Sequence, residues 1–212
     1  MTLSCATVAA HAESFFQAEA GLGVSQTRDD GDDVWVQYGL PHTEHLTTSG
    51  LMAGLTGPLV SRGDFDLRYH LDYNYLGQIS VTSNAVPDQD YSVPQHKVTD
   101  PVPLALFHSS GHVQGVSFLA DLGYTWNGVR LGAQAGPWLY WQTWHVTDYV
   151  AGGQQIIDVS HSPTMQFGWV LGASLEWKRM TVAYRYFQEK QAWNPNPGIA
   201  TGTHMVMASY RF

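Results

Sequence analysis

The sequence predicts an all-β fold: an eight-stranded antiparallel transmembrane β-barrel whose strands follow an up-and-down meander. Three observations predict it. Apolar residues alternate with polar or small ones in eight stretches, only 13% of the residues are charged, and the connections alternate between long and short. A water-soluble domain carries about a quarter of charged residues, and no apolar run approaches the roughly 18 residues of a membrane helix. The competing interpretation is a soluble β-sandwich with a polar outer face.

The first four expected strands each present one apolar face and one polar or small face, because side chains alternate along a strand. In residues 15–25 the second face carries Gly, Gln and Glu, which a crowded barrel interior tolerates. In residues 47–59 three leucines share the first face. Residues 65–75 alternate most clearly, with apolar or aromatic residues at odd positions and polar or charged ones at even positions. Residues 113–126 repeat the pattern.

The last four expected strands cover residues 129–144, 165–177, 180–187 and 201–212. Asn127-Gly128 precedes them and suits a two-residue hairpin, in which both turn positions need positive φ. Pro137 costs one ladder hydrogen bond, and a β-bulge would accommodate it. The final strand places Val206, Ala208, Tyr210 and Phe212 on one apolar face that ends at the chain terminus.

The connections between these strands indicate an orientation. The long ones are residues 26–46, 78–112, 145–164 and 188–202, and the short ones are residues 60–64, 127–128 and 178–179. Outer-membrane barrels have long extracellular loops and short periplasmic turns. We therefore expect a bacterial outer-membrane location, with the loops extracellular and both termini periplasmic.

The N-terminal residues predict a processed segment. Residues 1–12 are small and weakly apolar, and Ala10-His11-Ala12 fits an A-x-A cleavage site. No Lys or Arg precedes that site, so the segment is expected to be a signal peptide remnant, either truncated or preceded by an upstream start. Residues 13–212 would then form the barrel. The single Cys5 lies in the first segment, so no disulfide is expected in the mature chain.

The inward face of the expected barrel carries charges of both signs. An eight-stranded barrel is about filled by its side chains, so these charges must pair with one another to avoid a large desolvation cost. We predict a structural salt-bridge network formed by Glu19, Asp66, Arg68, Asp72, Asp121, Arg130, Glu176 and Arg185. A narrow channel for small molecules is the alternative, and the bulky inward Trp138 and Tyr140 make it less favourable.

The long connections are acidic and contain aromatic residues. They hold eleven Asp or Glu and three Lys or Arg. The difference, −8, equals the formal net charge of the whole chain. Loop aromatics could anchor a partner or simply pack on the rim; they are Trp35, Tyr38, Tyr91, Tyr149 and Trp193. The run 29–33 could hold Ca²⁺ through carboxylate oxygens, but it lacks the spacing of an EF-hand, so a solvated acidic loop is favoured.

The sequence offers no strong metal or cofactor signature. His42-x-x-His45 and His108-x-x-x-His112 could each supply two ligands, but neither lies on an expected helix and no Cys accompanies them. We expect surface histidines, no metal and no cofactor.

One catalytic alternative rests on His108 and Ser110. If strand pairing extends that far, they share a face, and Ser beside a His base is the minimum for acyl transfer. The His-x-Ser element is similar to that of outer-membrane lipid A deacylases, although Gly111 stands where that family often has Asn. That resemblance implies a lipid A-modifying ester hydrolase. The third catalytic residue is not assigned, and the chain is expected not to be an enzyme.

The eight strands and the ending Ser209-Tyr210-Arg211-Phe212 resemble the Ail/OmpX/Lom group of small outer-membrane barrels. That resemblance implies surface interaction or adhesion, with outer-membrane lipid, lipopolysaccharide, the barrel assembly machinery and an extracellular protein as partners, and no nucleic acid. Residues 16–21 and 54–59 resemble barrel proteins carried by phages and prophages, which implies a phage partner or modification of the host surface.

Overall fold

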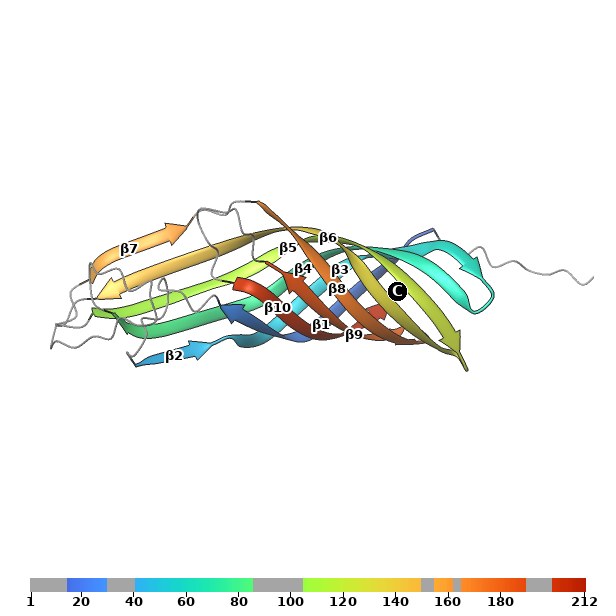
Figure 1. Ribbon diagram of the computed structural model, residues 1–212, viewed down its shortest axis with the longest axis horizontal. Helices are drawn as coiled ribbons and strands as arrows, with labels where there is room; N and C mark the ends of the chain where they lie inside the picture. The colour runs from blue at the N-terminus through green and yellow to red at the C-terminus, as the bar shows by residue number, and fades with distance from the viewer. Residues whose placement is uncertain (1–14, 30–40, 86–104, 150–154, 162–164, 190–199) are drawn as a thin grey trace, which may run out of the picture.

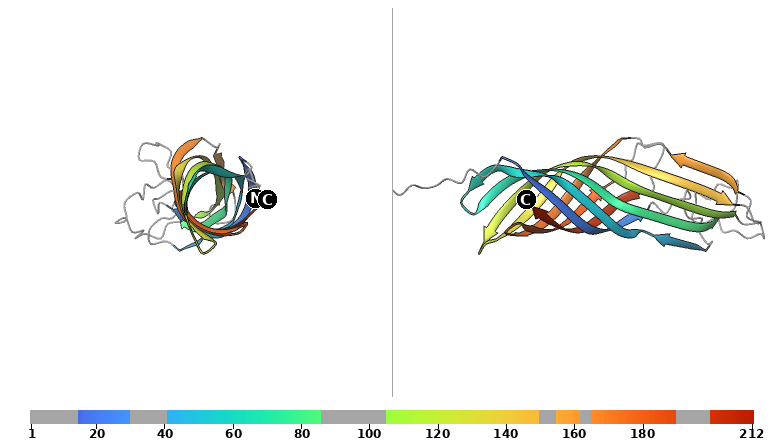
Figure 2. Two further views of the ribbon diagram at one scale, coloured as in Figure 1. Left: turned by 90° about the vertical axis from the view of Figure 1, so that its right-hand side faces the viewer. Right: turned by 180° about the vertical axis from the view of Figure 1, so that it is seen from behind.

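The strands close into a barrel. The computed structural model describes residues 15–29, 41–85, 105–149, 155–161, 165–189 and 200–212 (Figure 1). The barrel strands are β1 (Gln17–Asp29), β3 (Thr47–Arg62), β4 (Phe65–Ala85), β5 (Ala105–Trp126), β6 (Val129–Tyr149), β8 (Gln166–Trp177), β9 (Met180–Gln188) and β10 (Ala200–Arg211). Each pairs antiparallel with the next, and β10 pairs with β1, so the end-on view in Figure 2 shows a closed ring. The predicted eight-stranded meander is confirmed.

Three tight turns join strands at one end of the barrel. The predicted Asn127-Gly128 hairpin is confirmed, with φ of 50° and 79°. Gly63, at φ 62°, and Lys178, at φ 59°, occupy the other two turns. Because both β1 and β10 have their terminal ends on this side, we call it the turn end of the barrel.

Pro137 does not produce the bulge that would have accommodated it. It pairs with Trp169 of β8, and the β5–β6 register is the same on both sides of it: Ser117 pairs with Trp138, and Ala120 with Ala135. The missing N–H therefore only interrupts the β5–β6 ladder between these two pairs.

Three adjacent strands rise higher than predicted. β4, β5 and β6 are 21 or 22 residues long, and two further strands extend the same wall. β2 (His42–His45) pairs with β4, and β7 (Gln155–His161) pairs with β6. We call β2, β7 and the parts of β4, β5 and β6 between them the tall wall; it lies at the loop end, opposite the turn end (Figure 1).

A β-bulge explains why alternation did not reveal the tall wall. The β4–β5 register shifts between Tyr75 and Gln78, and Gly77 there has φ 91°. One extra residue moves every later side chain of β4 to the opposite face. Ile79 and Val81 consequently point inward, and outward positions beyond the bulge are polar.

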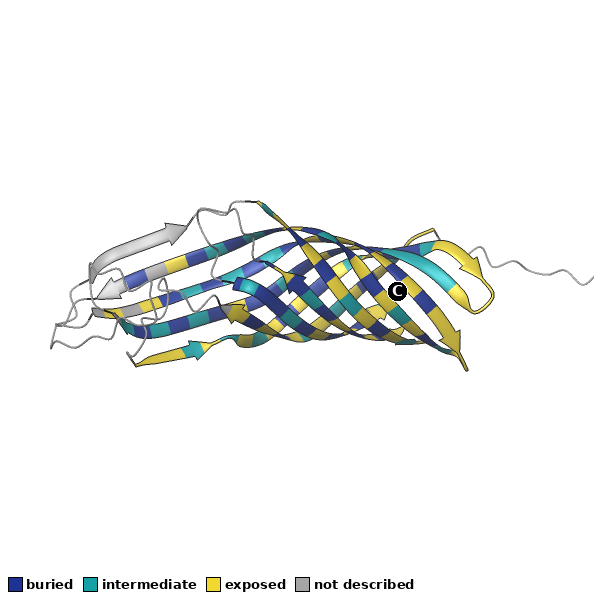
Figure 3. Ribbon diagram, viewed as in Figure 1, coloured by how far each residue is buried: buried dark blue, intermediate teal, exposed yellow. Residues whose placement is uncertain are grey.

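An apolar belt surrounds the barrel below the tall wall. Exposed and buried residues alternate along each strand (Figure 3), and large apolar side chains occupy the exposed positions. Examples from five strands are Leu22, Leu55, Phe118, Leu171 and Val206. In water this surface would be costly, whereas lipid accepts it. The fold is an eight-stranded transmembrane β-barrel. Among the described residues, no helix is long and apolar enough to cross a membrane.

Candidate functional site

The barrel interior near the turn end contains a network of ion pairs. Arg130 contacts Asp66 (2.6 Å) and Asp121 (3.0 Å). Arg68 contacts Glu176 (2.9 Å) and Asp66 (3.4 Å). The network holds all eight residues predicted for it, and Arg211 joins it through Glu176.

His70 lies between two buried carboxylates. Its Nε2 is 3.2 Å from Asp121, and its Nδ1 is 3.6 Å from Glu19. The rest of this interior network consists of five carboxylates and four guanidiniums. With a proton on His70, the numbers of positive and negative charges in the network are equal. The sequence placed His70 on the inward face but gave no sign of this bridging position.

Arg185 and Asp72 form the most buried ion pair of the network. Arg185 Nη1 donates to Asp72 Oδ2 at 2.8 Å, and Arg185 Nε donates to Gln134 at 2.9 Å. Arg185 is 1% exposed and Asp72 is fully buried. β9 and β4 are not neighbours in the sheet, so this pair crosses the lumen.

Aromatic side chains fill the interior toward the loop end. Trp138 stacks on Tyr140 at 4.6 Å and meets Phe187 edge-on at 4.9 Å, and each is at most 1% exposed. Trp138 Nε1 donates to the Gln188 carbonyl at 3.1 Å. We call Trp138, Tyr140 and Phe187 the aromatic plug; together with the ion network it leaves little room for passage.

Glu189 is an isolated buried carboxyl beyond the aromatic plug. It follows the last residue of β9 and is 3% exposed, and the preceding Gln188 is polar and faces outward. Neither carboxyl oxygen has a hydrogen-bond partner among the described residues. Burial raises the pKa of Glu189 to about 8, and the nearby Thr203 hydroxyl, which forms no well-aligned hydrogen bond with the carboxyl, opposes this less strongly. The expectation that Glu189 is one of the acidic residues of the long connections is wrong: its odd position, like those of Arg185 and Phe187, indicates an inward side chain.

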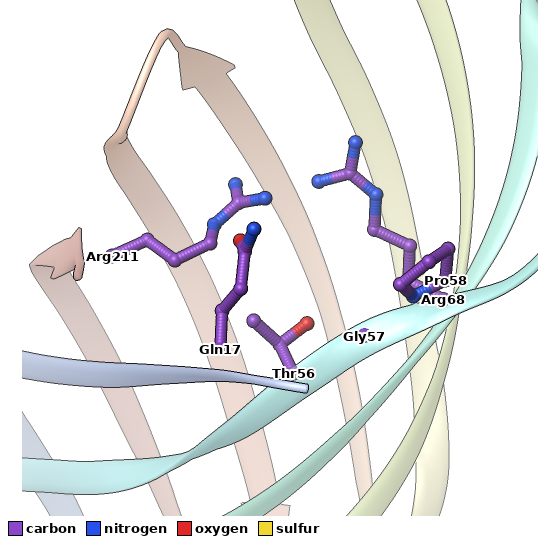
Figure 4. A pocket seen from close by; sticks show the side chains of 6 residues that line it. All are labelled: Gln17, Thr56, Gly57, Pro58, Arg68 and Arg211. Atoms are coloured by element: carbon purple, nitrogen blue, oxygen red, sulfur yellow. The ribbon is translucent and has the colours of Figure 1, made fainter. Parts of the chain in front are cut away.

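A small pocket opens at the turn end. Gln17, Thr56, Gly57, Pro58, Arg68 and Arg211 line a volume of about 30 Å³. In Figure 4 the polar ends of four of these side chains converge, from β1, β3, β4 and β10. Periodicity placed Arg68 and Arg211 inside the barrel but did not indicate the pocket.

The structure places His108 and Ser110 on one outward face of β5, as expected if pairing extended that far. His108 Nδ1, however, bonds the Thr82 hydroxyl at 2.8 Å. Ser110 pairs across the ladder with Ser80 and His145. Residues two apart on a strand lie about 7 Å apart, and the described residues show no hydrogen bond from Ser110 to His108. No catalytic triad is assembled among them.

The two histidine pairs are not chelating pairs. His42 and His45 are three residues apart on β2, so they face opposite sides. His108 and His112 share a face of β5 but are about 13 Å apart along it. Among the residues that the structure describes, no group of three His, Cys, Asp or Glu is placed to hold a metal.

The aromatic residues predicted to bind a partner lie mostly outside the described part of the chain. Outside it lie Trp35, Tyr38, Tyr91 and Trp193, together with residues 30–33 of the acidic run and the expected signal segment. The backbone of Tyr149 ends β6, opposite Leu106.

Comparison with known proteins assigns this chain to no family. No family model and no curated protein matches the sequence. The solved structure of Ail from Yersinia pestis, in complex with the heparin analogue sucrose octasulfate, is similar at 14% identity, covering 93% of this chain and 97% of that one, with a TM-score of 0.44. Neisserial surface protein A is similar at 15% identity, covering 94% and 98%, with a TM-score of 0.38. The fold rests on the closed strand pairing and the apolar belt. The chain is a small barrel of the outer-membrane type.

The coupling between Arg185 and Asp72 can be measured by a double-mutant cycle. We expect Arg185→Leu to lower the free energy of unfolding by about 3–5 kcal/mol, because it leaves Asp72 buried and charged without its partner. Adding Asp72→Asn should recover much of this loss. Urea unfolding in detergent micelles measures the free energy of unfolding of each variant. As a control, the exposed Arg28→Leu variant should stay within about 0.5 kcal/mol of wild type. Strictly additive losses would contradict the pairing.

Glu189 predicts a pH dependence. The unfolded chain releases this proton near pH 4.5, whereas the folded barrel keeps it until about pH 8. Stability contributed by this group therefore falls as pH rises between these values. We expect Glu189→Gln to raise the Tm at pH 8 by several degrees and to change it little at pH 4.5. Melting curves across this range test it, with the turn variant Asp64→Asn as control. A shift that is the same at every pH would refute it.

Proposed function

We propose that the protein is an integral outer-membrane barrel that displays its tall wall and four long connections at the cell surface for interaction or adhesion. The observation that supports this is the tall wall. Three strands continue beyond the apolar belt and gain two more strands, β2 and β7. Such an ordered extension costs conformational entropy, and spanning the membrane does not require it.

The different lengths of the connections at the two ends of the barrel support the proposed orientation. Tight turns and the terminal ends of β1 and β10 share one end, and all four long connections leave from the other. Outer-membrane barrels place short turns in the periplasm and long loops outside. The proposed arrangement has the tall wall extracellular.

The charge of the connections favours a basic partner. Without the buried Glu189, they hold ten acidic residues against three basic ones, so they repel anionic lipopolysaccharide unless divalent cations bridge the two. An extracellular protein with a basic patch fits this charge directly. If the chain is carried by a phage, as the resemblance of residues 16–21 and 54–59 implies, its display would alter the surface of the host.

Cell-surface labelling and adhesion test this proposal together. In a Cys5→Ser background, His108→Cys should react with a membrane-impermeant maleimide on intact cells, whereas Asp64→Cys should react only after the outer membrane is permeabilised. Displaying cells should adhere to immobilised basic proteins more than to acidic ones, and salt should weaken this adhesion. Shortening the four connections to Gly-Ser turns should abolish it while the barrel still inserts.

The reverse labelling pattern would overturn the orientation. Adhesion that survives shortening of all four connections would overturn their role.

Lipid A deacylation is the alternative with a specific observation behind it. His108 and Ser110 share an outward face just above the apolar belt, where lipid head groups lie. Against it, His108 bonds Thr82 rather than Ser110. We expect identical lipid A mass spectra from cells expressing wild type and Ser110→Ala. Loss of an acyl chain in wild type alone would establish the hydrolase instead. The channel alternative is disfavoured by the aromatic plug.

A further inference from the structure

We propose that the pocket at the turn end binds a carboxylate group. Its walls are rich in hydrogen-bond donors: the guanidiniums of Arg68 and Arg211, the Gln17 amide and the Thr56 hydroxyl (Figure 4). No carboxylate is among the described residues that line it. A cluster of donors that includes two guanidiniums and no acceptor carboxylate favours an oxyanion.

Two buried polar atoms in the pocket lack a protein partner. Thr56 is 2% exposed, and its Oγ1 has no hydrogen-bond partner among the described residues. Arg211 Nε is buried and likewise has none there. Buried donors are nearly always satisfied, and leaving one unpaired costs about 1–3 kcal/mol. A bound oxyanion would satisfy both.

The two guanidiniums are held in place by their other edges. Glu176 lies between them, with Oε2 2.9 Å from Arg68 Nη1 and Oε1 on Arg211 Nη2. Asp66 contacts Arg68 Nε at 3.4 Å but is also shared with Arg130. Three guanidiniums thus share these two carboxylates, and Arg130 also reaches Asp121. Fixing both side chains in advance reduces the entropy lost on binding.

The size of the pocket favours a carboxylate. About 30 Å³ accommodates roughly two water-sized groups, which matches the two oxygens of a carboxylate. Planar guanidinium forks also fit that geometry. The carboxylate could belong to a small free acid or to the end of a peptide or polymer chain. The inference that this pocket faces the periplasm rests on the proposed function. Binding of a carboxylate in the pocket does not depend on that function.

The test follows the Arg211 Nε–H signal in barrel labelled with ¹⁵N-arginine and held in detergent micelles. The signal is identified by its loss in Arg211→Lys. Acetate, a tripeptide with a free carboxylate, and the same tripeptide as its amide are titrated at constant ionic strength against chloride. We expect saturable shifts with both carboxylates and none with the amide. Thr56→Val should weaken binding about tenfold, and Arg62→Lys, exposed at the same end, should leave it unchanged.

Tighter binding of the tripeptide than of acetate would support a chain end as the natural ligand, and the opposite order would support a small free acid. Equal shifts with chloride, with the amide or in Thr56→Val would overturn the site, because two ordered waters would then satisfy its donors. The measurement uses micelles, so it can succeed even if the proposed orientation or adhesion fails.

Discussion

The narrow interior of an eight-stranded barrel is the constraint on which the rest of this structure depends. It is filled by side chains, so the charges inside must satisfy one another. Arg185 on β9 reaches Asp72 on β4, and Arg68 on β4 reaches Glu176 on β8. These pairs join strands that are not neighbours in the sheet. The network therefore braces the barrel across its lumen, in addition to the ladder hydrogen bonds around it.

Because side chains fill the lumen, the features proposed to bind a partner or ligand lie at the two ends of the barrel. The aromatic plug and the ion network fill the interior and stabilise the barrel. The two ends carry different groups. At the loop end, the bulge at Leu76-Gly77 lets one side of the barrel continue as the tall wall. At the turn end, the same ion network supplies the guanidiniums of the pocket. One set of inward charges thus serves both the fold and the proposed carboxylate site.

Much of the fold could be predicted because alternation is a local property. All eight barrel strands were located, and so was the Asn127-Gly128 turn. The tall wall was missed because one extra residue at Gly77 reverses the faces of β4, and because an outward face above the lipid is no longer apolar. His108 and Ser110 were placed on one face correctly, but periodicity could not show that His108 bonds Thr82.

Within the apolar belt, the sequence by itself determined which residues face inward and which face lipid, since a strand has a period of two and its apolar face must be buried or meet lipid. It also determined that the inward charges of both signs had to pair. Only the tertiary structure decided which charge meets which, because this depends on the register between strands far apart in the chain. Gln17, Thr56, Arg68 and Arg211 lie on four different strands. Closure of the barrel alone brings them to one pocket.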